Sequence, residues 1–378
     1  MSTAVTLQLG LVVAIAGLVF AEPDDTKISS SLDTRQQVWA IRVGQLMKVP
    51  AARAGNEHYE TEGLSFSPDD KRLAVVVNRS RLLIMDSQSP ETNIRQFDLT
   101  GTCGIDVTWN ERGDALLVCG TLLRLADGAS CDATGLTPPI IRESSSIKAF
   151  WLDSEHVVRS NTGEILDLAC KLVSVWQLAP TWQIGAVAAS KGWVFLWHSE
   201  GPRQKVVYQY SLADRASHQA LNGWPIRKVP GPSGGAMLAI GAEAWCFSLH
   251  EQNDLKNGKL QCREINGGTE IPVLKQVRSY QLTEAASSSA RVVAEKWEQY
   301  HLPWWEWWVP VPGWPALPVR RVVFDLRSGN VIASWKPRIQ DSMSPYIADY
   351  PYHCALSASG EYLAESGDGS IELYRLAP

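Results

Sequence analysis

The chain lacks the residue patterns that mark several common sites. Its seven cysteines never form a Cys-x-x-Cys pair, and its seven histidines show no metal-binding spacing such as His-Glu-x-x-His. It also has no basic excess, because the formal net charge is -5, whereas nucleic-acid-binding proteins carry a basic patch or stripe. The sequence therefore indicates no zinc ribbon, no thioredoxin-type redox site and no nucleic-acid partner, and it leaves any cofactor unknown.

Helical periodicity is scarce throughout the 378 residues. Short apolar runs alternate instead with Gly, Asp, Asn, Ser and Pro, a pattern typical of strands joined by turns. Apolar residues make up 45% of the chain and charged residues 20%, so a folded core is expected. The composition predicts an all-β globular protein.

The odd number of cysteines leaves two interpretations open. They are buried apolar residues, or they form one or two disulfides with at least one thiol left over. Spacing alone does not give a pairing.

A strand–turn–strand unit recurs along the chain. It is clearest in 353–378, where Ser357–Gly360 and Gly367–Gly369 supply residues suited to tight turns. It recurs at Phe66–Val77 and Trp109–Val118, and Phe66 and Trp109 are 43 residues apart. Weaker copies are found at 150–159, 187–197, 230–241 and 287–294. In the copy at 230–241, Met237–Ile240 is predicted to be the second strand, after a glycine turn.

These units resemble the blades of WD40-like β-propellers, whose repeats span 40–45 residues. The resemblance covers residues 36–378 and implies an all-β propeller of about seven four-stranded blades. The chain contains no Gly-His and no Trp-Asp dipeptide, so the strict signature of the family is absent. For that reason the peptide-binding rim of the family is not transferred to named residues.

A lone strand at Val38–Val43 precedes the first repeat. Propellers commonly close their ring by completing the last blade with a strand from the other terminus. We therefore expect Val38–Val43 to pair with Ile371–Leu373 as the outer strand of the last blade.

The N-terminus reads as a secretory signal peptide. Leu9–Ala21 is an uninterrupted run of 13 apolar or small residues, which is within the range of a signal-peptide core and too short to span a bilayer. Because Lys and Arg are missing before this run, the alternatives are an uncleaved membrane anchor and a misassigned start. The predicted division is a signal peptide at 1–21, a linker at 22–35 and the propeller at 36–378.

A stretch rich in tryptophan and proline interrupts the repeat at 301–318. It holds five of the 16 tryptophans and five prolines, and proline argues against a central strand. We interpret it as a loop inserted in the sixth blade. Its rings either cap the propeller's own edge or form a recognition surface for a glycan, a protein or a membrane. Glu306 and the prolines make it difficult for every ring to face inward, so at least two are expected to stay exposed. The candidate partner-binding residues are Trp304, Trp305, Trp307, Trp308 and Trp314.

Two patterns that look catalytic have simpler explanations. Gly231–Gly235 matches Gly-x-Ser-x-Gly, but an apolar run in strand register follows it, where a nucleophile elbow needs a helix. Asp69, Asp70, Asp325 and Asp368 lie at the repeat's turns and are interpreted as turn formers.

The sequence thus favours a non-catalytic, secreted or periplasmic propeller, expected to be monomeric, that acts as a protein- or glycan-binding scaffold. One alternative is an enzyme on the same fold, such as a quinoprotein-type dehydrogenase, a lyase or a lactonase, with its site at the central channel. Another is a sensor or assembly factor tethered to a membrane by its N-terminus.

Overall fold

The computed structural model describes residues 33–47, 61–99, 107–134, 149–188, 192–200, 207–219, 226–230, 238–240, 244–251, 254–264, 270–271, 281–299, 316–337, 353–367 and 369–378. Nearly all regular structure in these residues is β-strand, with one short helix, α2 (Val43–Leu46). None of the helical structure in these ranges has the length and apolar character needed to cross a bilayer.

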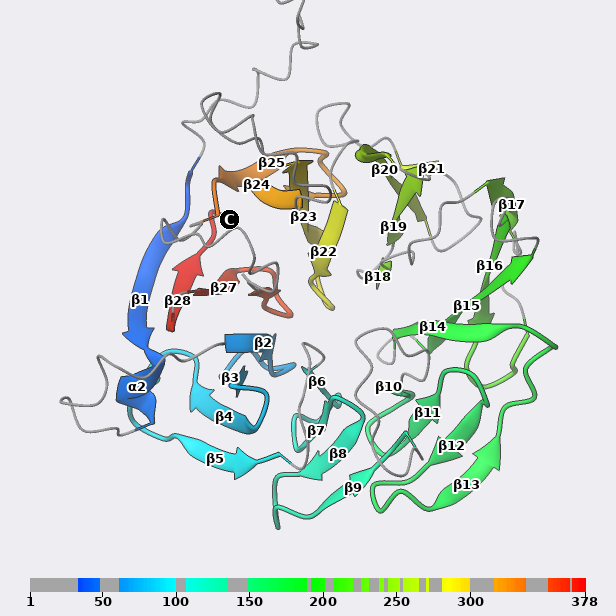
Figure 1. The fold of residues 1–378 in the computed structure, drawn as a ribbon, viewed down its shortest axis with the longest axis horizontal. Coiled ribbons are helices and arrows are strands. Elements are labelled where there is room, and N and C mark those ends of the chain that lie inside the picture. Colours follow the sequence, from blue (N-terminus) through cyan, green and yellow to red (C-terminus); the bar gives the residue numbers. More distant parts are fainter. Residues whose placement is uncertain are drawn as a thin grey trace, which may run out of the picture.

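The described strands form seven four-stranded antiparallel sheets, which Figure 1 shows arranged in a ring. The all-β propeller that the repeat predicts is therefore confirmed.

We number the sheets as blades in chain order. Blade 1 contains β2 (Thr61–Phe66), β3 (Arg72–Val77), β4 (Arg81–Asp86) and β5 (Arg95–Asp98). Blade 2 contains β6 (Val107–Trp109), β7 (Ala115–Val118), β8 (Thr121–Arg124) and β9 (Ser130–Asp132). Blade 3 contains β10 (Ala149–Trp151), β11 (Val157–Arg159), β12 (Glu164–Leu166) and β13 (Leu172–Val175).

The second half of the ring follows the same order from the inner to the outer strand. Blade 4 contains β14 (Gln183–Ala188), β15 (Trp193–Glu200), β16 (Val207–Asp214) and β17 (Ile226–Pro230). Blade 5 contains β18 (Leu238–Ile240), β19 (Ala244–Glu251), β20 (Asp254–Glu264) and β21 (Glu270–Ile271). Blade 6 contains β22 (Gln281–Ala285), β23 (Arg291–Gln299), β24 (Ala316–Asp325) and β25 (Val331–Trp335). Blade 7 contains β26 (Cys354–Leu356), β27 (Tyr362–Gly367), β28 (Ser370–Arg375) and β1 (Gln36–Arg42).

The core lies between the blades. In β3 every residue from Leu73 to Val77 is fully buried, and the side chains alternate between two clusters. Leu73, Val75 and Val77 pack with residues of blade 7, whereas Ala74 and Val76 pack with residues of blade 2. A strand that is buried on both faces has no polar side, which explains why its sequence is a continuous apolar run.

The outer strand of blade 7 comes from the N-terminal part of the chain. β1 pairs antiparallel with β28 from Gln36 opposite Arg375 to Arg42 opposite Ser370. The strand therefore begins two residues before Val38. It also ends before Val43, which begins α2 and donates its backbone N–H to the carbonyl of Gly369 at 2.8 Å.

A repeated hydrogen bond connects successive blades. The indole N–H of Trp109 donates to the carbonyl of Ser65 at 3.0 Å, and that of Trp151 donates to the carbonyl of Thr108 at 3.1 Å. Each bond joins the inner strand of one blade to the inner strand of the blade before it. The large aromatic residue at the end of the repeat's first strand thus serves as an inter-blade connector.

Arginine makes a second connection of this kind. Arg72, the first residue of β3, donates to the carbonyl of Gly113 in the next blade's turn at 2.8 Å. Arg291, the first residue of β23, donates in the same way to Gly360 at 2.9 Å. Both glycines have positive φ, +69° and +75°, a conformation that glycine adopts at little cost.

One predicted repeat was assigned to the wrong strand of its blade. Met237–Ile240 was expected to be a second strand, but β18 is the inner strand of blade 5, and β19 is the second. The glycine-rich residues before β18 lie outside the described residues. Inner and second strands are both short and apolar here, so the pattern alone does not distinguish them.

Candidate functional site

The five tryptophans singled out from the sequence, at 304, 305, 307, 308 and 314, lie outside the described residues. The strands on either side of them are described, and they form the hairpin of β23 and β24 in blade 6. The five tryptophans therefore fall in the segment of the sequence that joins β23 to β24.

Within the described residues, β23 and β24 pair with each other over a longer stretch than with their other neighbours. They stay paired from Arg291 opposite Asp325 to Gln299 opposite Ala316. The described pairing of β22 with β23 reaches Glu295, and that of β25 with β24 reaches Arg321. The described pairing of the hairpin continues beyond these points for the four residues from Lys296 to Gln299, a length of about 13 Å at 3.3 Å per residue.

The predicted loop boundary at Pro318 was three residues too far along the chain. Ala316–Pro318 belong to β24, and Pro318 is opposite Trp297 just beyond a register shift at Lys296. Proline is tolerated beside a bulge. The described pairing of β24 with β25 runs from Arg321 to Phe324 and does not include Pro318.

An ion pair lies where the hairpin leaves the blade. Glu295 and Arg321 are directly opposite each other, and the Arg321 Nε atom is 2.5 Å from Oε1 of Glu295. Their side chains are only 4% and 2% exposed. Such a buried charge is tolerated only when it is paired, so this pair fixes the base of the hairpin.

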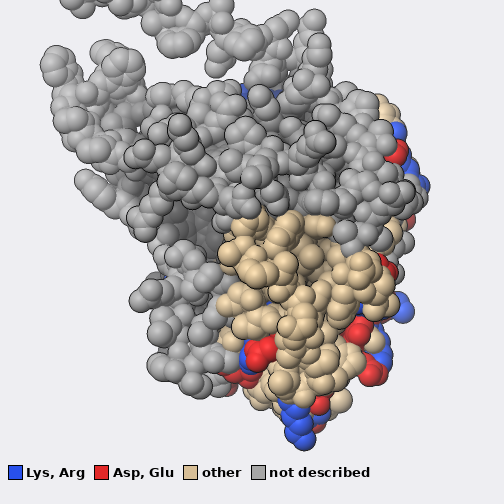
Figure 2. Space-filling model, turned by 90° about the vertical axis from the view of Figure 1, so that its right-hand side faces the viewer, with Lys and Arg blue, Asp and Glu red and all other residues tan. Residues whose placement is uncertain are grey.

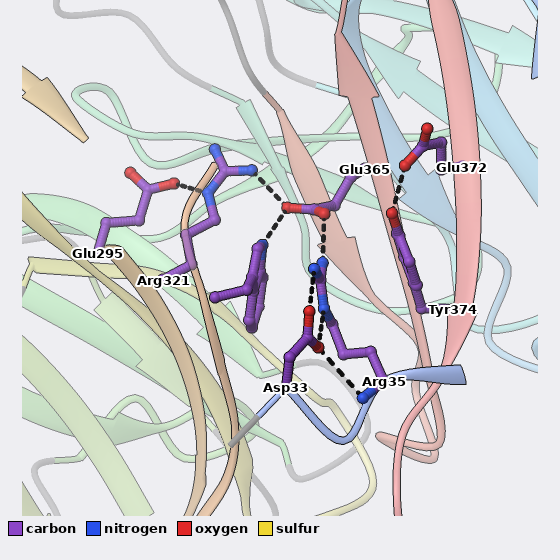
Figure 3. A network of polar contacts seen from close by, with 8 residues as sticks. Asp33, Arg35, Glu295, Arg321, Glu365, Glu372 and Tyr374 are labelled. Carbon is purple, nitrogen blue, oxygen red and sulfur yellow. Dashed lines mark hydrogen bonds and ion pairs between the residues drawn. The ribbon is translucent and has the colours of Figure 1, made fainter. Parts of the chain in front are cut away.

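Blade 7 presents a matching row of polar groups to this pair. Cys354, Glu365 and Glu372 are paired side by side across β26, β27 and β28. Glu365 accepts hydrogen bonds from Nη1 of Arg321 at 2.9 Å and from the Trp335 indole at 2.8 Å. Figure 3 shows Glu365 between Arg321 on one side and Arg35 on the other.

Arg35 brings the N-terminal segment into the same network. Its Nη1 is 2.5 Å from Oε2 of Glu365, and its Nε is 2.8 Å from the carboxylate of Asp33. Its guanidinium carbon lies 4.2 Å from the ring centres of both Trp335 and Tyr374. Two cation–π contacts and two carboxylates thus hold one side chain that is 8% exposed. We call Asp33, Arg35, Glu295, Arg321 and Glu365 the charge clasp.

The contacts shift the pKa values of Asp33, Arg35 and Arg321 toward their charged forms. Burial alone would lower the pKa of Arg321, but the surrounding Cys354, Glu295 and Glu365 raise it above its usual value. Burial likewise opposes the charge of Arg35, while Asp33 and Glu365 raise its pKa. The hydrogen bond from Arg35 lowers the pKa of Asp33, against the effect of burial.

Two further groups at this junction are held neutral. Burial raises the pKa of the Tyr374 hydroxyl, and its hydrogen bond to Glu372 adds to the effect. Burial, together with the charge of Arg321, lowers the pKa of His353 to about 3. Within the described part of the chain, Nε2 of His353 is buried without a hydrogen-bond partner.

The charge clasp holds secondary-structure elements together. The carboxylates of Asp33, Glu295 and Glu365 all accept contacts from arginine side chains, so their charge is used within the protein. No group of three or more His, Cys, Asp or Glu suited to a metal ion occurs in the ranges that the structure describes. What the clasp can do is fix the base of the β23–β24 hairpin, and the N-terminal segment, to the seam of blades 6 and 7.

The turn residues behave as the sequence indicates where they are described. Asp69 accepts a hydrogen bond from the Lys71 N–H, and Asp325 accepts from the N–H groups of Arg327 and Ser328. Asp70 reaches further, because its carboxylate accepts from the Ala358 and Ser359 N–H groups of blade 7. Asp368 and Gly231–Gly235 lie outside the described residues.

The structure also decides between the two interpretations of the cysteines. Cys131 and Cys170 form a disulfide that joins β9 of blade 2 to the turn before β13 of blade 3. Cys119 and Cys262 each take part in a disulfide as well, whereas Cys354 is a buried thiol at the clasp. The interpretation with disulfides and a remaining thiol is the one that the described cysteines support.

Sequence reasoning missed the charge clasp. The available signal was a charged residue inside an apolar strand, as at Glu295 after Val292–Ala294 and at Arg321 before Val322–Phe324. Each of these residues alone resembles a solvent-facing position of a strand. The hairpin register places Glu295 opposite Arg321, and only the ring brings Glu365 of blade 7 into contact with this pair.

The fold and these contacts define a class, a β-propeller with a long hairpin in blade 6 and a charged seam beside it. Comparison with known proteins adds no family: no protein-family model matches the chain, and no curated protein matches it either.

Proposed function

We propose that this protein is a non-catalytic, secreted or periplasmic propeller that binds a protein or glycan partner through its tryptophan-rich loop. The observation that carries the proposal is the β23–β24 hairpin, whose strands stay paired as far as Gln299 and Ala316 and lead directly into the five tryptophans. A hairpin held at its base by a buried ion pair is a rigid support for a binding loop.

The chemistry of the loop agrees with a binding role. Tryptophan combines a large apolar ring with one N–H donor, which suits both sugar faces and protein hot spots. Burying one aromatic side chain removes roughly 150–250 Å² from water. Several exposed rings in one loop would therefore supply much of the energy of a contact.

The disulfides support a location outside the cytosol. Structural disulfides persist in secreted and periplasmic proteins and are rare in the cytosol. The bond between Cys131 and Cys170, the bonded states of Cys119 and Cys262, and the apolar run ending at Ala21 all agree with export. The intact mass of the protein from its native host tests this part, because a chain that still begins at Met1 and needs detergent for extraction would contradict it.

The binding role is tested by changing the tryptophans. Replacing Trp304, Trp305, Trp307, Trp308 and Trp314 with alanine should leave the melting temperature close to the wild-type value and should reduce acrylamide quenching of fluorescence. The same variant should lose binding in a glycan array or in cross-linking to proteins of the native host.

Two results would contradict the proposal. If the substitutions unfold the domain, the rings cap the propeller and do not form a contact surface. If the variant folds and keeps every partner of the wild type, the loop is not the binding site. Trp151→Ala is the matched control, because its indole bonds to the neighbouring blade and its loss should lower stability without selectively removing a partner.

A further inference from the structure

The outer strand of blade 3 is unusually apolar for an exposed edge. β13 is the last strand of its sheet, and every residue of Leu172–Val175 is exposed. Leu172, Val173 and Val175 are 58%, 55% and 41% exposed. The chain then stays uncharged as far as Trp182. Figure 2 faces the side of the ring on which Figure 1 places β13, and it shows a broad described area without Lys, Arg, Asp or Glu.

Other outer strands are protected in ways that β13 is not. β5 carries Arg95 and Asp98, and β17 carries Arg227, Lys228 and Pro230. The last three residues of β25 are buried. Charge, proline and coverage are the usual means of preventing an edge strand from pairing with another chain. β13 has neither a charge nor a proline; it is four residues long, and its pairing with β12 shifts register between Leu172 and Ser174.

Both ends of β13 are fixed. Before it, Cys170 is bonded to Cys131 of blade 2, and Asp167 accepts hydrogen bonds from the Ala169 and Lys171 N–H groups at 2.8 and 2.9 Å. After it, Trp176 is 3% exposed and stacks on His218 with ring centres 4.1 Å apart. β13 is therefore already held in an extended conformation, so little conformational entropy would be lost when it pairs with another strand.

The backbone of β13 shows which groups face outward. Trp176, directly after β13, donates its N–H to the carbonyl of Gly163, directly before β12, at 2.8 Å, and Ser174 is paired with Ile165 of β12. Because alternate residues of an antiparallel strand direct their N–H groups to opposite sides, that of Val175 points away from β12. The outward N–H of Val175, flanked by apolar side chains, is a group with which another extended chain can pair.

We propose that β13 binds an extended, uncharged segment of a partner protein, which adds a fifth strand to blade 3. The exposed area selects this occupant over a second copy of the chain. Three half-exposed aliphatic side chains offer roughly 200 Å² of apolar surface. A stable dimer buries about 800 Å² on each partner, so β13 alone is too small for one. The surface belongs to blade 3, and the proposal does not depend on the tryptophan-rich loop of blade 6.

The experiment is a titration of the isotopically labelled full chain followed by amide NMR. The probe is a short, blocked peptide of alternating threonine and valine with one lysine at each end. We expect saturable shift changes confined to Leu172–Val175 and slower hydrogen exchange at Val175, with a Kd below about 1 mM. The same peptide with methylated backbone nitrogens, which cannot donate, should not bind.

Variants at Val175 distinguish the addition of a strand to β13 from other modes of peptide binding. Val175→Pro removes the outward N–H at an edge, where proline is tolerated, and should weaken binding at least tenfold. Val175→Thr keeps the N–H and the branched side chain and should bind like the wild type. If Val175→Pro fails to fold, Val175→Lys takes its place, because a charge on the edge should weaken binding as well.

Three results would overturn the proposal. The first is the absence of saturable shifts at β13 up to millimolar peptide. The second is equal binding by the wild type and the Val175→Pro and Val175→Lys variants. The third is a dimer in sedimentation equilibrium that Val175→Pro dissociates, which would make a second copy the occupant.

Discussion

Arg35 and Glu365 form an ion pair, with Nη1 and Oε2 2.5 Å apart, although they are 330 positions apart in the sequence. Glu365 is in turn bonded to Arg321, so one carboxylate joins the N-terminal segment to the hairpin of blade 6. Thr34 adds a hydrogen bond from its hydroxyl to the carbonyl of Ile332 at 2.6 Å. The seam between blades 6 and 7 is thus connected by both apolar packing and charge.

Glu365→Gln should lower the free energy of unfolding by about 3 kcal/mol, because it leaves two buried arginines without a shared carboxylate. Urea unfolding of the purified protein measures this. The matched control is Glu361→Gln on the exposed turn before β27, which should change stability by less than about 0.5 kcal/mol. Equal stability of the two variants would show that the clasp contributes nothing.

Deleting residues 36–45 should sharply lower the melting temperature. The deletion removes β1 and so exposes the edge of β28, whose Ile371 and Leu373 are fully buried in the intact protein. It also removes the bond from the Trp39 indole to the Ser87 carbonyl of blade 1 at 2.8 Å. Calorimetry checks this, with Gln37→Ala on the exposed side of β1 as the control. A truncated chain that melts with the intact one would refute closure by β1.

Stability should fall as the pH decreases from about 6.5 toward 3, and His353 should contribute to that fall. Its pKa is about 3 in the folded protein and 6.5 as a free side chain, so the unfolded chain binds a proton in this window that the folded protein does not. The stabilisation is complete above pH 6.5 and is lost progressively below it. At pH 5 the loss should be about 2 kcal/mol relative to pH 7.

Urea unfolding at pH 7 and pH 5 measures this loss. His353→Gln removes the titrating group, so the variant should lose less stability than the wild type between the two pH values. An identical pH slope in both proteins would exclude His353 as a source of the dependence.

Breaking the bond between Cys131 and Cys170 should destabilise the protein by about 3–4 kcal/mol, since the bond closes a loop of 39 residues. The double variant Cys131→Ser and Cys170→Ser tests this in urea under oxidising conditions, where the other bonded cysteines stay intact. Cys354→Ser, which changes a buried thiol, is the comparison that separates packing from cross-linking. An unchanged midpoint in the double variant would show that the bond does not stabilise the ring.

The sequence by itself determined the local elements and the class of fold. Turn residues such as Asp69 and Gly360 and apolar runs such as Leu73–Val77 act over a few residues, and their physical preferences are visible in the letters. The 43-residue spacing of Phe66 and Trp109 then reports one blade, because each repeat must bury its faces against the next. The same reasoning failed at Met237–Ile240, where two kinds of apolar strand look alike.

Only the tertiary structure decided which distant groups meet. Arg35, Arg321 and Glu365 lie on three different strands or segments, and no local preference couples them. Cys131 and Cys170 come together because neighbouring blades pack side by side, and β13 is exposed because it is the last strand of its sheet. Such contacts depend on closure of the ring, because closure fixes the distances between blades. The pattern of residues along the sequence does not specify those distances.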